Sequence, residues 1–447
     1  MTKLLKNRQK LREAVGRFRT LLRHGLVQNI LSLYAVQVAS YLVPLVTIPY
    51  LARVLGAAGW GLVAFAQAFG GYLSLGLEYG FVLSGTREVA RHRDSGEKMA
   101  DVLAGVLGAK LALLVPAIAL ALVARHFVPI FRTHPGLFWA AAFWAVAQAF
   151  SMLWYFQGLE QMRLVAILDV SSKALAAVGI FTLVRAPGDE WKVLALQGTA
   201  AFLSMLVATV LAYQRVRFRL PTPRLAWEAI RMGWSMFLFR GASSLYTVGN
   251  AFILGLFASP TLVGYYAGAE KISRAVVGLL NPVSQSLFPR LSYLVEHARD
   301  RAARLARLGV VLMGTGGAVL GLSVFLLAPA AVRLILGPGY EPSVLVLRIL
   351  ALLPLLIALS NVFGIQWMLP LGLDRPFNTI IILGGGLNVT LALLLASRFT
   401  AIGMASAVVT AEAFVTVAMY VHLRWRKLDP FTHSPSLVRA SCQGPNP

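Results

Sequence analysis

Residues 41–91 read YLVPLVTIPYLARVLGAAGWGLVAFAQAFGGYLSLGLEYGFVLSGTREVAR and contain two long apolar runs separated by a short turn. Gly56, Gly59 and Gly61 mark this turn, and they let the second run begin close to a neighbouring segment because glycine has no side chain. A helix needs about 20 predominantly apolar residues to cross roughly 30 Å of hydrocarbon. The two runs therefore predict two membrane-spanning helices joined by a tight turn.

The rest of the chain continues this pattern. Of its 447 residues, 58% are hydrophobic and 13% are charged, whereas soluble domains are about 45–50% apolar and about 25% charged. Hydropathy and helical periodicity predict twelve spans, at residues 27–52, 60–83, 102–124, 136–157, 164–184, 192–213, 233–257, 262–288, 306–328, 344–369, 376–397 and 400–422. We expect an all-α integral membrane protein with about twelve transmembrane helices and short loops, and not a soluble enzyme.

Residue usage excludes several classes of function. The single cysteine, Cys442, lies in a polar tail, so the chain forms no disulfide framework and no thiolate metal cluster of its own. The seven histidines show no metal-binding spacing, so no metal site is predicted. Nucleic acid is not an expected partner despite the net charge of +23, because the sequence lacks a soluble basic surface with aromatic or groove-reading elements.

The positive charges follow a membrane topology instead. With the N-terminus in the cytoplasm, 28 of the 41 Lys and Arg residues fall in the two tails and the even-numbered loops, and seven fall in the odd-numbered loops. The positive-inside rule then predicts that both termini are cytoplasmic. The first 24 residues are basic and amphipathic and lack a cleavable signal. They either lie on anionic membrane lipids or act only as a topology determinant.

A weak internal repeat emerges when the chain is shifted by 203 residues. Gly61 then falls on Gly264, and Arg87 falls on Arg290. Each half holds six spans, so both halves keep one orientation and form a parallel repeat around a central cavity. We predict a cytoplasmic tail at 1–24, an N-terminal lobe at 25–215, a cytoplasmic linker at 216–232, a C-terminal lobe at 233–424 and a cytoplasmic tail at 425–447. Two such lobes are the usual basis of alternating access.

The segment quoted first also carries a set of linear motifs. They are PLVTIPYLARVLG at 44–56, GWGLVAFAQ at 59–67, EYGF at 78–81 and SGTREVA at 84–90. This set resembles the N-terminal signature of Wzx-type O-antigen flippases, in the polysaccharide transport branch of the multidrug/oligosaccharidyl-lipid/polysaccharide exporter (MOP) superfamily. Residues 263–290 look like the family's repeat of this segment. Elsewhere the likeness is architectural.

The resemblance implies a MATE-like fold and a cargo. The fold has two six-helix lobes, and the cargo is an undecaprenyl-pyrophosphate-linked oligosaccharide, such as an O-antigen repeat unit, moved from the cytoplasmic to the outer leaflet of a bacterial inner membrane. Polysaccharide polymerase and assembly proteins are candidate partners. The sugar specificity of the family does not carry over with these motifs.

Two prolines lie within the first predicted span. Pro44 and Pro49 each remove a backbone donor, so we expect the helix to bend there. A fixed kink and a moving hinge are both open interpretations.

Ionisable residues inside the spans point to a polar interior, because each costs about 2.5–3.5 kcal/mol at the centre of a membrane helix on insertion scales. The cations are Lys110, Lys173, Arg240, Lys271, Arg274 and Arg348, and the carboxylates are Glu78, Asp169, Glu270 and Glu412. Arg348 lies one turn from a helix start and can reach the interface, so it counts for less. The other five cations are the candidate substrate-binding residues of a cationic cavity.

Local pairing is the competing interpretation for part of this set. Asp169 with Lys173, and Glu270 with Arg274, are i,i+4 neighbours that can neutralise one another. Lys110, Arg240 and Lys271 have no such partner. The surplus of positive charge predicts an anionic cargo, such as a pyrophosphate, held by charge-assisted hydrogen bonds.

Glu412 is the lone carboxylate of the last predicted span. With Asp169 and Glu270 it is a candidate cavity carboxylate for proton or sodium coupling, and pairing of Glu412 with a cation from another helix is the alternative. No other cofactor is expected.

Two further functions compete with a flippase. A drug exporter of the same superfamily needs anionic groups to hold cations, whereas six cations face four carboxylates here. A membrane enzyme that polymerises or transfers glycans needs acid and base groups on a substantial outer loop, and the predicted outer loops are short. A carrier makes and breaks no covalent bond, so no catalytic residues are predicted.

Overall fold

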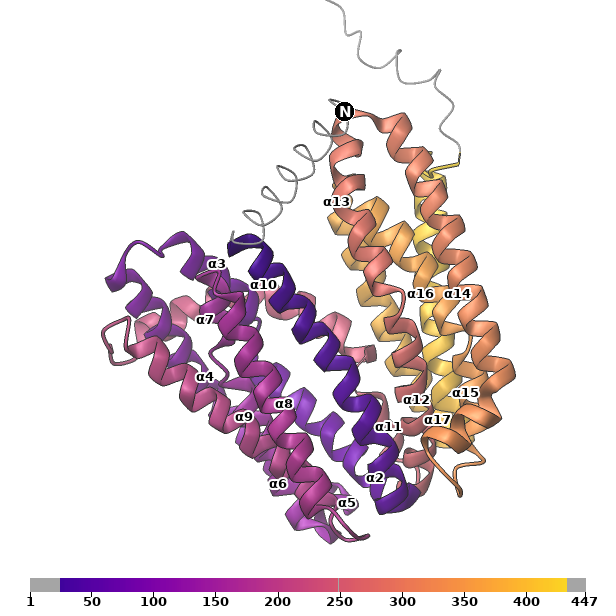
Figure 1. The fold of residues 1–447 in the computed structure, drawn as a ribbon, viewed down its shortest axis with the longest axis horizontal. Helices are drawn as coiled ribbons and strands as arrows, with labels where there is room; N and C mark the ends of the chain where they lie inside the picture. The colour runs from indigo at the N-terminus through magenta and orange to yellow at the C-terminus, as the bar shows by residue number, and fades with distance from the viewer. Residues whose placement is uncertain (1–24, 248, 432–447) are drawn as a thin grey trace, which may run out of the picture. The chain divides into compact units, whose positions relative to one another are not determined.

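The computed structural model describes residues 25–247 and 249–431, so the predicted tail at 1–24 and Cys442 lie outside the described residues. Every regular element in the described part is helical, which confirms the all-α prediction (Figure 1). The chain divides into two compact units, one made of Met1–Thr47 and Phe69–Leu238 and the other of Ile48–Ala68 and Phe239–Pro447.

Helix α2 (Gly25–Glu78) contributes to both units. The first unit also holds α3 (Phe81–Arg91), α4 (Gly96–Phe127), α5 (Pro129–Thr133), α6 (Pro135–Ala149), α7 (Leu153–Gly158), α8 (Met162–Leu183), α9 (Glu190–Tyr213) and most of α10 (Pro223–Thr247). The second unit holds α11 (Asn250–Gly255), α12 (Pro260–Gly278), α13 (Asn281–His297), α14 (Arg299–Ile335), α15 (Ser343–Leu350), α16 (Leu353–Ser360), the π-helix η1 (Asn361–Met368) and α17 (Asp374–Trp425).

The compact units are divided differently from the lobes expected at 25–215 and 233–424. Residues Ile48–Ala68, from the first predicted lobe, belong to the second unit. The lobe boundaries therefore stay a prediction.

Helix α2 contains the predicted span 27–52 and most of 60–83, and helix α17 contains the predicted spans 376–397 and 400–422. Helix α2 breaks at Gly56, where φ is 66°, a conformation that glycine adopts without strain. Helix α17 breaks at Thr400, where φ is 50°. The backbone passes Pro49 without leaving the helical conformation, and the side chain of Pro44 lies outside the described residues. The kinks at the two prolines stay predictions, whereas the turn expected at Gly56 is present.

Eight helical stretches of the described chain are long and apolar enough to span a membrane. The predicted spans 233–257 and 262–288 are not among them and correspond to α10–α11 and α12–α13. Arg240 and the charges from Glu270 to Arg274 make these helices less apolar. The helices thus follow the predicted order of spans along the chain.

The packing has the polarity expected in lipid. Large apolar side chains such as Val115 on α4 and Leu326 on α14 are exposed, while aromatic side chains such as Trp154 and Trp367 are fully buried. Because lipid tails are as apolar as leucine, helix association in a membrane depends on close packing and polar contacts.

Glycine packing in the second unit reproduces the predicted repeat. A Cβ atom on Gly61 would lie 1.8 Å from the carbonyl oxygen of Pro260, and one on Gly264 would lie 1.9 Å from that of Ala57. Ala57 and Pro260 are 203 residues apart, as are Gly61 and Gly264, so the two contacts are images of each other. This reciprocity is what a local two-fold axis between α2 and α12 requires.

The helices that follow these two also correspond. After α2 the chain turns at Tyr79 and Gly80 into α3, which carries Arg87, and after α12 it turns at Leu279 into α13, which carries Arg290. The repeat therefore extends from the glycine contact into the following helix, as far as Arg87 in α3 and Arg290 in α13.

Candidate functional site

Helix α4 places Lys110 deep in the first unit. The helix begins at the N-cap Ser95, whose hydroxyl accepts a hydrogen bond from the backbone N–H of Lys98 at 3.4 Å. Gly105, one turn and a half before Lys110, has no side chain and lets the carbonyl of Leu225 on α10 approach. The Lys110 side chain is only 3% exposed.

The charge of Lys110 has weak local compensation. Its ammonium lies 5.8 Å from the ring centroid of Phe150, a cation–π distance. No hydrogen bond or ion pair joins it to another residue in the described part of the chain. Glu78, at the end of α2, acts on it electrostatically. A buried ammonium in this setting is suited to an anionic ligand.

The predicted pair of Asp169 and Lys173 in the first unit is neutralised within one helix. On α8, the Lys173 ammonium lies 2.6 Å from the Asp169 carboxylate. Both side chains are partly exposed, and the i,i+4 spacing accounts for the contact. The structure thus shows the local pairing that the sequence offered as the alternative to cargo binding.

In the second unit, α12 carries a polar network centred on Glu270. Its Oε1 atom accepts hydrogen bonds from Arg274 at 2.8 Å, from the Tyr266 hydroxyl at 3.2 Å and from the Asn250 amide of α11 at 3.4 Å. Tyr266 and Asn250 are buried. The carboxylate is therefore held by three donors and is 13% exposed.

Lys271 and Arg274 give this network a surplus of positive charge. Lys271 is half-buried, and among the described residues it makes no hydrogen bond and no ion pair. The Arg274 side chain is 48% exposed, and its guanidinium has five N–H donors, of which the contact with Glu270 engages only a part. Two cations beside one carboxylate give this part of α12 a net positive charge, which favours an anion.

The remaining predicted cations are placed differently. Arg240 belongs to α10, and its side chain lies outside the described residues. Arg348 lies on α15, with its guanidinium 5.3 Å from the ring centroid of Phe325. The structure brings Glu270, Lys271 and Arg274 together on one helix of the second unit, and it places Lys110 and the Asp169–Lys173 pair in the first unit.

Glu412 lies in the second arm of α17 and is 8% exposed. Its Oε1 atom is 2.7 Å from the hydroxyl oxygen of Ser360, the last residue of α16. In the described part of the chain, no Lys, Arg or His side chain lies within ion-pair distance of this carboxylate. The cationic partner considered from the sequence is therefore not found there.

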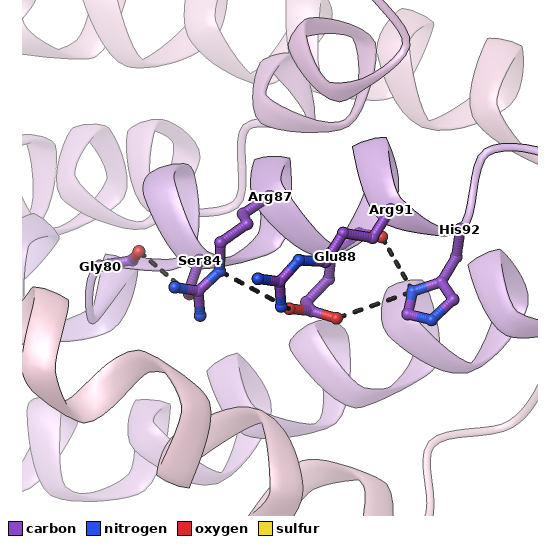
Figure 2. Close-up of polar contacts among 6 residues, drawn as sticks. All are labelled: Gly80, Ser84, Arg87, Glu88, Arg91 and His92. Carbon is purple, nitrogen blue, oxygen red and sulfur yellow. Dashed lines mark hydrogen bonds and ion pairs between the residues drawn. The ribbon is translucent and has the colours of Figure 1, made fainter.

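Helix α3 carries a charged cluster that the sequence analysis did not single out as a site (Figure 2). Three basic side chains surround Glu88, with nitrogen–oxygen distances of 3.6 Å for Arg87, 3.1 Å for Arg91 and 3.6 Å for His92. The i,i+3 and i,i+4 spacing of Arg91 and His92 from Glu88 is the signal that predicts it. The same signal relates Tyr266 to Glu270, whereas nothing in the sequence relates Asn250 to Glu270.

Comparison with known proteins gives a family and named relatives. Residues 26–295 match the model of a family described as polysaccharide biosynthesis protein. An Escherichia coli (strain K12) protein that carries the name O-antigen transporter is 31% identical over 409 residues, covering 90% of this chain and 98% of the relative. A Shigella dysenteriae protein of the same name is 30% identical over 399 residues, covering 88% and 98%.

Solved structures share the fold. The lipid II flippase MurJ, in an inward closed conformation, superposes with a TM-score of 0.65 at 11% identity and covers 89% of this chain and 87% of its own. An inward-facing multidrug resistance transporter of the MATE family, in the MOP superfamily, gives a TM-score of 0.61 at 13% identity, with 86% and 98% covered. At these identities the likeness concerns the fold alone, and it confirms the MATE-like fold expected from the sequence.

Proposed function

Since this chain belongs to the polysaccharide biosynthesis protein family, we propose that it is a flippase for lipid-linked oligosaccharides. Its cargo is an undecaprenyl-pyrophosphate-linked repeat unit of a surface polysaccharide such as O-antigen. It moves this cargo from the cytoplasmic to the outer leaflet of a bacterial inner membrane by alternating access. The name O-antigen transporter of the two relatives supports this choice of cargo.

One observation carries the proposal, namely two lysine side chains within the predicted spans that form no ion pair in the described part of the chain. Lys110 is 3% exposed and has no ion-pair partner in the described part of the chain. Lys271 stands beside a carboxylate that Arg274 already occupies. Buried ammonium groups are expensive in a membrane unless they meet an anion or water. A pyrophosphate-linked headgroup supplies that anion.

Each residue of the site has a distinct role in this proposal. Lys110 and Lys271 act as compact point charges for phosphate oxygens. Arg274, held by Glu270, adds positive charge beside Lys271 for the same phosphate oxygens. Tyr266 and Asn250 hold the Glu270 carboxylate in place, so that its charge orients Arg274 and does not face the pyrophosphate. Arg240 is proposed as a further cargo ligand on its sequence position, whereas Lys173 is neutralised by Asp169.

The topology and partners follow from the same proposal. Both termini lie in the cytoplasm, as the distribution of Lys and Arg indicates. The helix α3 cluster, which follows the second span, then lies at the cytoplasmic face, where the cargo is loaded. Polysaccharide polymerase and assembly proteins are proposed to act on the cargo after it crosses the membrane.

A drug exporter of the same fold fits the charges less well. A carrier for organic cations needs a carboxylate that is free to meet them. Asp169 and Glu270 are both engaged with basic side chains of their own helices, and Glu412 is only 8% exposed and hydrogen-bonded to Ser360.

The test begins with deletion of the gene in its native host and staining of the surface polysaccharide. Loss of the stain is expected, and restoration by the intact gene completes the assignment. Complementation with Lys110→Ala or Lys271→Ala is expected to restore much less polysaccharide. Lys98→Ala, an exposed lysine in the first turn of α4, is the matched control and is expected to complement fully. Unchanged surface polysaccharide in the deletion strain would falsify the proposal.

A further inference from the structure

The second arm of α17 buries a carboxylate near its middle. Glu412 is about 17 Å along the helix from Ala401, where the arm begins after the break at Thr400. The side chain is 8% exposed. An ionised carboxylate at this depth needs a cation or several hydrogen-bond donors to offset the loss of water.

The described contacts provide one side-chain donor. The Ser360 hydroxyl lies 2.7 Å from Glu412 Oε1. The nearby Thr416 hydroxyl does not serve the carboxylate, because its single hydrogen has two backbone carbonyl acceptors, that of Leu356 at 3.1 Å and that of Glu412 itself at 2.9 Å, and goes to one of them. The carboxylate is therefore short of donors in its ionised form.

The geometry around Ser360 fits a carboxyl group that carries a proton. The Ser360 oxygen also lies 3.2 Å from the carbonyl oxygen of Ile357. A serine hydroxyl has a single hydrogen, so it donates to one of these two acceptors at a time. If Glu412 is protonated, its O–H donates to Ser360 and the Ser360 hydroxyl donates to Ile357. Both short distances are then hydrogen bonds.

Charged groups on the neighbouring elements do not replace the proton. Helix α17 packs against α11, α12, α15, α16 and η1. Of these, α11, α16 and η1 carry no ionisable side chain. Helix α15 carries Arg348, whose guanidinium lies over the Phe325 ring. Helix α12 carries the paired Glu270 and Arg274 together with Lys271, Tyr265 and Tyr266. The first arm of α17 carries Asp374, Arg375 and Arg398, and the second carries Tyr420, His422 and Arg424. In the described part of the chain, none of the basic groups is within ion-pair distance of Glu412.

The backbone next to Ser360 supplies an independent observation. The π-helix η1 begins at Asn361, directly after Ser360. π-Helical turns are rare and occur frequently at functional sites. A π-turn holds an extra residue, and its loss rotates the following helix by about 100°. The Ser360 contact thus stands at the junction of two helix types.

We propose that Glu412 and Ser360 form a proton-binding site in the second unit, in which Glu412 takes up a proton from water and the new O–H bonds to Ser360. The site rests on the proposed flippase function in one respect, since its loading and release accompany the transport cycle. Glu412 acts on the cargo only through the helices and is a positioning residue in that cycle.

Infrared spectroscopy of the full-length protein in lipid vesicles tests the site without any transport. A protonated carboxyl has a C=O stretch that is separate from the bands of ionised carboxylates. The intact protein is expected to show this band at neutral pH, and Glu412→Gln is expected to lose it. Glu341→Gln, which removes an exposed carboxylate of the same unit, is the control and keeps it. Ser360→Ala retains the carboxyl group but loses its hydrogen bond, so the band is expected to shift in frequency.

Two results overturn the proposal. One is a spectrum of Glu412→Gln that coincides with that of the intact protein, with no shift in Ser360→Ala. The other is absence of the band from the intact protein at neutral pH, which means that Glu412 is ionised there. Neither result bears on the flippase proposal, because that proposal is tested by a separate measurement, the loss of surface polysaccharide in the deletion strain.

Discussion

Replacing Gly61 or Gly264 with alanine is expected to push apart the two helices that cross at these residues. The added methyl carbon would lie 1.8 Å from the Pro260 oxygen or 1.9 Å from the Ala57 oxygen, whereas ordinary van der Waals contacts begin at 3.4 Å. The helices must therefore separate locally by about 1.5 Å, with loss of dispersion contacts on both sides. Both obstructing atoms are backbone oxygens, which cannot swing away like a flexible side chain.

Overpacking of this kind lowers the free energy of unfolding by about 1–3 kcal/mol. Alanine also gains about 1 kcal/mol over glycine in a helix interior. Gly76 lies on the same helix α2, and a Cβ there meets no neighbouring atom within 4 Å. Gly76→Ala therefore isolates that gain. The assay is the thermal unfolding midpoint of the purified protein. Gly61→Ala and Gly264→Ala are expected to melt below the intact protein, and Gly76→Ala at or above it.

The double variant Gly61→Ala with Gly264→Ala gives a sharper result. Both contacts lie at one crossing, so a separation that accommodates one methyl group partly accommodates the other. The loss in the double variant is expected to be smaller than the sum of the single losses. The reasoning is refuted if Gly61→Ala melts like Gly76→Ala, or if the two losses add in full.

Three other predictions concern single contacts. Tyr340→Phe removes the 3.1 Å hydrogen bond from the buried Tyr340 hydroxyl to the Ala52 carbonyl. The variant is expected to lower the free energy of unfolding by about 0.5–1.5 kcal/mol. An unchanged denaturation midpoint contradicts this prediction. The backbone N–H of Arg185, and then the Lys192 ammonium, hold the pKa of Asp189 below its ordinary value of 3.8. This contribution to stability is present above that value and is lost as the pH falls below it, so Asp189→Asn is expected to flatten the acid limb of the melting profile; equal profiles for both proteins oppose it. Lys173→Ala is expected to lower the amount of surface polysaccharide because it leaves the Asp169 carboxylate unpaired. Adding Asp169→Ala to the same gene is expected to restore the polysaccharide. If the double variant does not restore it, Lys173 is instead a cargo ligand.

Local spacing along the chain was sufficient for a large part of these conclusions. The apolar runs predicted the helices in their order, because a membrane helix needs a fixed length of apolar sequence. The pairs Asp169–Lys173 and Glu270–Arg274 were visible for the same kind of reason, since residues four apart share one face of a helix. Arg91 and His92 around Glu88 belong to this class too.

Contacts between helices were beyond the reach of that reasoning. Ser360 and Glu412 are 52 residues apart, and Asn250 and Glu270 are 20 apart. Helical periodicity states which residues share a face, but not which other helix that face meets or at what height. The π-helix after Ser360 likewise leaves no mark in the pattern of apolar residues.

The sequence by itself determined that this protein spans a membrane, how its helices follow one another, and which family it belongs to, because hydrophobic length and linear motifs are properties of the chain. Only the tertiary structure decided that Gly61 meets Pro260, that Ile48–Ala68 joins the second unit, and that Glu412 is buried beside Ser360 without a described cation. The physical reason is that helix rotation and pairing depend on packing among many side chains at once, and on where glycines permit backbones to touch.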